Sequence, residues 1–366
     1  MKKKILATFC ALIVTGVVSG QAGAIEVKPS GRLHWDYATH KEDARALEDK
    51  DMLRRARLGL EGRFDENWKF ELAYEFANDG DFDDGEFKDV YIKYSGWKAG
   101  AITAGQFKVP FGLERQMSSN NHPFIERALP SDVFSQSRRV GVGFDTGNKA
   151  YTLALMGYGS SIDGNEGDGV AARATFAPIH NDNNLLHLGI AVAADKLDER
   201  PNFRTYPESR PTDFRFVRTG RLDDVDRVNQ LGLELAWQAG PFSAQSEWMQ
   251  ADVKRTGGAD DVQLGGWYVS GGWIMTGETR GYKDGSFRSI KPSRPLGAWE
   301  LTARYSEVDL NDRDVEGGRQ RNTTLGVNWY AKEYVRVMLN YIQVDSDRRG
   351  VSDDPRILLL RAQLSF

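Results

Sequence analysis

Apolar and polar side chains alternate along this chain in one run after another. In the last run, residues 356–366, an apolar side chain stands at every second position and the chain stops on the ring of Phe366. This period of two is typical of β-strands with one apolar face, and the 3.6-residue period of a helix fits it poorly. A strand that ends at the chain's own carboxylate is typical of the strand that closes a β-barrel.

The first residues add a second constraint. Three lysines at 2–4 precede an apolar run, 5–18, and an Ala-Gly-Ala sequence follows at 22–24. This order predicts a secretory signal peptide, residues 1–24, and leaves residues 25–366 as one barrel domain. A membrane-anchoring helix is the alternative, but the apolar run is shorter than the roughly 20 residues that a bilayer requires.

Composition excludes several classes of function. The only cysteine, Cys10, lies in the leader, so the mature chain has no thiol for disulfides, redox chemistry or zinc-thiolate binding. Removal of the leader lowers the basic count from 48 to 45, against 52 acidic residues, for a net charge of −7. A nucleic-acid partner requires a basic surface and is not expected.

The mean hydropathy of −0.52 argues against a helical membrane protein. A barrel reconciles this value with a membrane, because each strand shows lipid only every second side chain. Alternating segments predict an all-β fold, a 16-stranded antiparallel transmembrane β-barrel in the outer membrane of a Gram-negative bacterium. A secreted β-sandwich or a repeat protein is the alternative, but tryptophans at strand ends favour the aromatic girdles of a membrane barrel.

Short and long connections alternate along the chain, as expected for periplasmic turns and outer loops. One inner connection, 276–297, is longer than this rule predicts. The long connections are expected at 39–51, 78–86, 108–138, 159–169, 196–228, 254–262, 309–320 and 345–355.

Arginines gather on the second predicted strand. If apolar side chains face lipid, Arg55 and Arg57 face the lumen, and Arg54 lies beside them. In a narrow channel such charges attract anions strongly because the effective dielectric constant falls. The same arginines could instead face acidic groups across a wide lumen, without strong selectivity.

The third long loop, 108–138, contains apolar residues such as Phe111 and Phe124, which favour folding against the barrel interior. An inward-folded third loop would narrow the pore and bring Lys108, Arg115 and Arg127 to its waist. The fifth loop, 196–228, could place basic side chains in the vestibule, although these could also pair with acids of the same loop. The vestibule candidates are Arg204, Arg210, Arg215, Arg218 and Arg221.

Five short stretches lie between about Gly31 and Phe366: Leu-Arg54-Arg55-Ala, Phe-Gly-Leu-Glu-Arg115 with Ser118-Ser119, Ile-Glu-Arg127, Gly-Ala-Trp299-Glu-Leu and Thr-Leu-Gly-Val-Asn-Trp329-Tyr-Ala. In these stretches the chain resembles the phosphate-selective porins O and P. The resemblance implies a trimeric sixteen-stranded barrel whose inward loop holds a dehydrated anion between basic side chains and serines. By this resemblance Arg54 and Arg55 would belong to an arginine ladder, Arg115 and Arg127 to the loop cations, and Ser118 and Ser119 to the serine pair.

Two positions depart from the family pattern. Asn120 stands where phosphate-selective members carry a lysine after the serine pair, and Lys88 followed by Asp89 stands where an acid is expected in the fourth strand. Loss of a cation at the waist would weaken phosphate capture, so the sequence predicts anion preference more directly than phosphate specificity.

These features predict a passive outer-membrane channel for small anions, phosphate or polyphosphate among them. Its expected partners are these anions and the surrounding outer-membrane lipids, and the family resemblance implies two further copies in a homotrimer. No cofactor, metal or enzymatic activity is expected. A general or weakly cation-preferring porin is one alternative. An outer-membrane barrel hydrolase is another, since His34 and His187 are expected to face the lumen.

Overall fold

The computed structural model describes residues 25–78, 85–164 and 167–366. The predicted signal peptide, 1–24, lies outside these residues. None of the helices in the described part is long and apolar enough to cross a membrane.

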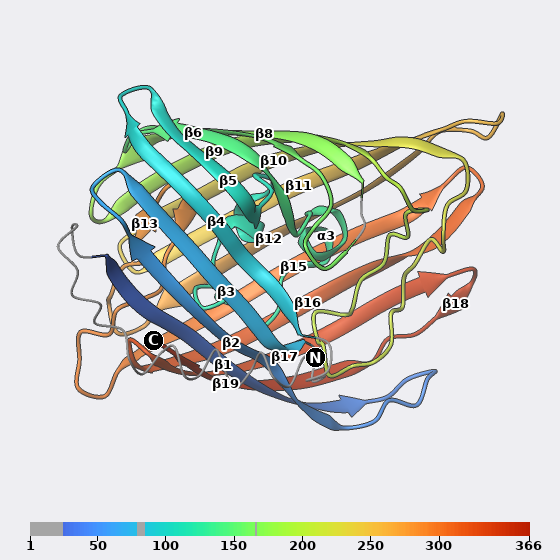
Figure 1. The fold of residues 1–366 in the computed structure, drawn as a ribbon. Coiled ribbons are helices and arrows are strands. Elements are labelled where there is room, and N and C mark those ends of the chain that lie inside the picture. Colours follow the sequence, from blue (N-terminus) through green and yellow to red (C-terminus); the bar gives the residue numbers. More distant parts are fainter. Residues whose placement is uncertain (1–24, 79–84, 165–166) are drawn as a thin grey trace.

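One closed antiparallel sheet accounts for most of the described chain (Figure 1). The sheet has seventeen strands, of which β18 (Val351–Ser352) is a two-residue addition to an outer loop, so sixteen strands form the wall and the predicted strand number is confirmed. The wall strands are β1 (Glu26–Lys41), β2 (Lys50–Arg63), β3 (Trp68–Asn78), β4 (Glu86–Trp97), β5 (Gly100–Lys108), β6 (Arg138–Gly147), β7 (Tyr151–Tyr158), β8 (Asp168–His180), β9 (Asn184–Lys196), β10 (Val225–Ala239), β11 (Phe242–Arg255), β12 (Val262–Ile274), β15 (Ala298–Asp312), β16 (Val315–Lys332), β17 (Val335–Arg348) and β19 (Arg356–Ser365).

The last strand closes the barrel on the first, as its pattern predicted. β19 pairs with β1 along ten residues, from Arg32 opposite Ser365 to Lys41 opposite Arg356. The backbones of Gly31 and Phe366 exchange two hydrogen bonds, of 2.9 and 3.1 Å. A Cβ atom at residue 31 would collide with the Phe366 ring, which explains why glycine occupies that place.

The barrel wall has its apolar side chains outside and its polar side chains inside. On β10, Leu233, Leu235 and Trp237 are 45 to 49% exposed, whereas the alternating Glu234 and Gln238 are 4% exposed. The inward side chains are buried because three segments fill much of the lumen.

The first of these segments is the third loop, residues 109–137, which folds into the barrel as predicted and contains α2 (Leu113–Gln116) and α3 (Leu129–Phe134). Figure 1 shows α3 inside the ring of strands. The second is the fifth loop, residues 197–224. Its Glu208 accepts hydrogen bonds from Arg304 and Thr324 of the wall, at 2.6 and 2.9 Å.

The third segment is the long inner connection that the alternation of loop lengths did not explain. Residues 275–297, called the inner hairpin below, contain the strand pair β13 (Tyr282–Lys283) and β14 (Ser286–Phe287). Phe287 is buried against Leu113 and Met117 of the third loop. The connection is long because it reaches into the lumen and supports the third loop.

One predicted outer loop is replaced by strand. Residues 309–320 were expected to form a long connection, but β15 and β16 continue outward to a two-residue turn, with Asp312 paired to Val315. Arg313 adopts a left-handed backbone, with φ of 53°, in this turn. Polar strands can extend beyond the membrane because water accommodates their side chains, so polarity alone did not mark the strand ends.

Candidate functional site

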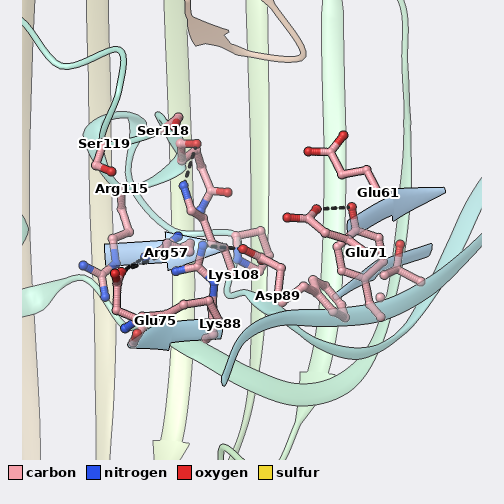
Figure 2. A pocket seen from close by; sticks show the side chains of 18 of the residues that line it. Arg57, Glu61, Glu71, Glu75, Lys88, Asp89, Lys108, Arg115, Ser118 and Ser119 are labelled. Carbon is pink, nitrogen blue, oxygen red and sulfur yellow. Dashed lines mark hydrogen bonds and ion pairs between the residues drawn. The ribbon is translucent and has the colours of Figure 1, made fainter. Parts of the chain in front are cut away.

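The lumen is divided into a packed side and an open side. On the packed side, Phe111, Leu129 and Phe134 of the third loop join an apolar cluster with side chains such as Met249 and Val308 of the wall. On the open side, a cavity of about 740 Å³ lies between the third loop and the wall strands near β2 to β6 (Figure 2). The open space in the lumen is therefore off-centre.

Basic side chains predominate around this cavity, with thirteen basic lining residues against six acidic ones. The acidic residues are Glu61, Glu71, Glu75, Glu86, Asp89 and Asp145. The basic residues are Arg32, Arg54, Arg55, Arg57, Lys69, Lys88, Lys93, Lys108, Arg115, Arg127, Arg138, Arg210 and Arg288.

A β-bulge explains how two consecutive arginines both reach the lumen. His34 pairs with Arg55 and Trp35 pairs with Leu53, so Arg54 is an extra residue on β2. An extra residue breaks the strict alternation of a strand and turns neighbouring side chains to the same face. Strict alternation would have placed Arg54 toward lipid.

The wall arginines pair with carboxylates. Arg54 donates from Nε to Glu126 at 2.9 Å, and Arg55 lies 3.8 Å from the same carboxylate. Arg57 donates to Glu75 from Nε and Nη2, at 3.0 and 2.7 Å. The charge of Arg57 is therefore offset by Glu75, whereas Arg54 and Arg55 share Glu126 and are offset only in part.

Four other cations contact only neutral oxygen atoms. Arg32 donates to the hydroxyl groups of Ser118 and Ser119, at 3.3 and 2.8 Å, and Lys108 donates to two backbone carbonyl groups of α2 and its C-terminal end. Arg115 and Arg127 likewise donate to backbone carbonyls, at 2.7 and 3.5 Å. Within the described ranges, no ion pair to a carboxylate is formed by any of these four cations.

Buried ion pairs fix the third loop in the lumen. Glu126 accepts hydrogen bonds from Arg54 and from Arg361 of β19, the latter at 2.7 Å. Burial alone would raise the pKa of Glu126, but Arg54, Arg55 and Arg361 outweigh it and hold this pKa well below its usual range. The carboxylate therefore stays ionised and keeps its partners.

Most predicted site residues meet at the cavity. Arg54, Arg55, Arg57, Lys108, Arg115, Ser118, Ser119 and Arg127 all line it. Asn120 does not line it, because its amide oxygen lies 3.1 Å from His34 Nε2 on the wall. Arg32 was missed by the sequence analysis, although the outward positions of Leu33 and Trp35 implied that it faces inward.

The predicted vestibule residues are dispersed. Arg210 lines the cavity and pairs with Asp132 of α3 at 2.7 Å. Arg215 packs over the Tyr206 ring, 4.0 Å from its centre. The remaining candidates, Arg204, Arg218 and Arg221, are exposed.

The two histidines considered for hydrolysis lie on the wall and contact both wall residues and segments inside the lumen. His34 is fully buried between Asn120 and Arg55. His187 is also fully buried, and its two ring nitrogens contact Tyr282 and Glu234, at 2.6 and 3.1 Å. Among the described residues, no group of three potential ligands is placed to hold a metal ion.

Comparison with known proteins decides the family. The model of the phosphate-selective porin O and P family matches residues 27–366. The chain belongs to this family. Its relatives include Porin O of Pseudomonas aeruginosa, which is 28% identical over 387 residues that cover 93% of this chain and 88% of the relative.

Solved porin structures share the fold. An anion-selective porin from Comamonas acidovorans has a TM-score of 0.64 at 13% identity, over 93% of this chain and all of the other. The trimer form of OmpT from Vibrio cholerae has a TM-score of 0.60 at 10% identity, over 94% of this chain and all of the other. Family and fold place this porin in the Gram-negative outer membrane.

Proposed function

We propose that this porin is a passive channel selective for small anions, phosphate among them. The observation that carries the proposal is the group of four cations, Arg32, Lys108, Arg115 and Arg127, that lack carboxylate partners among the described residues and line the same cavity as the Ser118-Ser119 pair. Because no described carboxylate pairs with these cations, their positive charge can attract a solute anion. The names of the matched family and of the Comamonas porin agree with this proposal.

The mechanism replaces water around the anion with protein donors. Guanidinium groups present forked N–H donors that match the oxygens of phosphate, and their hydrogen bonds are strengthened by charge. The serine hydroxyls add neutral donors beside Arg32. Conduction also requires that the anion leave, so several sites of moderate affinity are better than one tight site.

The proposed channel works as a homotrimer without a cofactor. The trimer form of OmpT supports this assembly. The apolar outer face of the wall, with side chains such as Leu233 and Leu235, would contact lipid where it is not covered by another subunit. Chemical cross-linking of the detergent-solubilised protein, read on a gel, tests the subunit number.

Reversal potential in a planar bilayer under a salt gradient tests the function. Anion preference is expected, and inorganic phosphate should reduce the single-channel chloride current by occupying the site. A reversal potential of the opposite sign would favour the general or cation-preferring porin. Chloride selectivity without any block by phosphate would retain the anion channel and remove phosphate as its solute.

A further inference from the structure

Lys88 is a cation of the cavity that the proposed anion site does not use. Between β3 and β4, Leu72 pairs with Val90 and Tyr74 pairs with Phe87, so Lys88 and Asp89 share one position opposite Ala73. Both side chains line the cavity. The bulge thus brings Lys88 into the lumen together with the acid beside it.

The neighbours of Lys88 differ in how firmly they are paired. Figure 2 shows Lys88 beside Glu75 and Arg57, with Glu61 and Glu71 at the other side of the cavity. Arg57 and Glu75 form a two-bond contact in which both side chains are buried. Asp89 accepts a hydrogen bond from Arg138 and forms an ion pair with it.

Lys88 pairs with Glu86, two residues away on the same strand. The side chain of Glu86 is 32% exposed, compared with 2% for Glu75. A partly exposed ion pair is weakened by water and salt, whereas a lysine ammonium on a flexible stem can change partners easily. A phosphate in the cavity can therefore compete with Glu86 for this ammonium.

The loop side of the cavity lacks a cation at the position after the serine pair, since Asn120 is turned toward His34. We propose that Lys88 is a specificity-determining residue, which supplies a cation to the anion from the wall side of the cavity, across from the third loop. Glu86 limits the affinity of Lys88 for the anion, because the two compete for the same ammonium group. This inference rests on the proposed anion channel. By this inference, part of the affinity for phosphate is set by two residues outside the third loop.

Substitution of each partner tests the inference through block of the chloride current by inorganic phosphate. Lys88→Gln should weaken the block several-fold. Glu86→Gln should strengthen it several-fold, because the ammonium loses its competitor, and the double variant should resemble Lys88→Gln. Lys332→Gln, which removes an exposed lysine at the end of β16, is the matched control and should behave as the unmodified porin.

Folding is checked first by the heat-dependent mobility of the barrel on a gel, and Lys88→Met serves as a second variant if Lys88→Gln does not fold. Equal phosphate block in folded Lys88 and Glu86 variants and in the unmodified porin would overturn the inference. Failure of the proposed function is distinguishable, because it appears in the unmodified porin itself, as absent anion selectivity or absent block by phosphate.

Discussion

Arg32 on β1 donates a 2.8 Å hydrogen bond to the Ser119 hydroxyl of the third loop, so a wall cation and a loop hydroxyl lie side by side at the cavity. Arg32→Ala should lower anion selectivity and weaken phosphate block about as much as Arg127→Ala, because each removes a cation that the described carboxylates leave unpaired. Arg221→Ala, at an exposed position, should have little effect. Reversal potentials of the three variants provide the measurement, and equal small effects would place the waist elsewhere.

The paired arginine of β2 should matter less than the loop arginines. Arg57→Gln removes a charge that Glu75 already neutralises, and the combined Arg57→Gln and Glu75→Gln change keeps the net charge of the cavity constant. We expect the double variant to retain the anion selectivity of the unmodified porin, while Arg115→Gln loses part of it. Loss of selectivity in the double variant alone would show that the pair itself contacts the solute.

Removal of the loop anchor should loosen the third loop. Glu126→Gln leaves Arg54 and Arg361 without their shared carboxylate, and breaking a buried ion pair costs about 3–5 kcal/mol. Open-channel current noise should rise, and a protease should cut the loop more readily. Unchanged current noise and unchanged resistance to the protease would show that other contacts suffice to hold the loop.

The same anchor should survive mild acid. The pKa of Glu126 is lowered in the folded protein, so the stability that it provides is present above its ordinary value of 4.5 and is lost only as pH falls through the lowered pKa. Current noise at about pH 5 should therefore match that at about pH 7. A rise in noise already at about pH 5 would contradict the prediction.

The inner hairpin should support the third loop. Phe287→Ala removes a buried ring from its contacts with Leu113 and Met117, and changes of this kind cost about 3–5 kcal/mol. The temperature at which the barrel loses its folded mobility on a gel should fall. Phe242→Ala, at an exposed ring on β11, is the control and should lower it less.

The barrel could be predicted from the sequence because lipid on one side and water or packed polar groups on the other impose a period of two on every strand. Details that depend on bulges could not be predicted. Neither the joint inward placement of Lys88 and Asp89 nor that of Arg54 and Arg55 follows from alternation. The pairing of Asn120 with His34 depends on a contact between distant segments, which no local pattern reveals.

The third loop packs on one set of strands and borders the cavity with another. Residues that hold the loop and residues that line the cavity are therefore largely different. Side chains that line the cavity can be exchanged among related channels while the scaffold that shapes the passage stays intact.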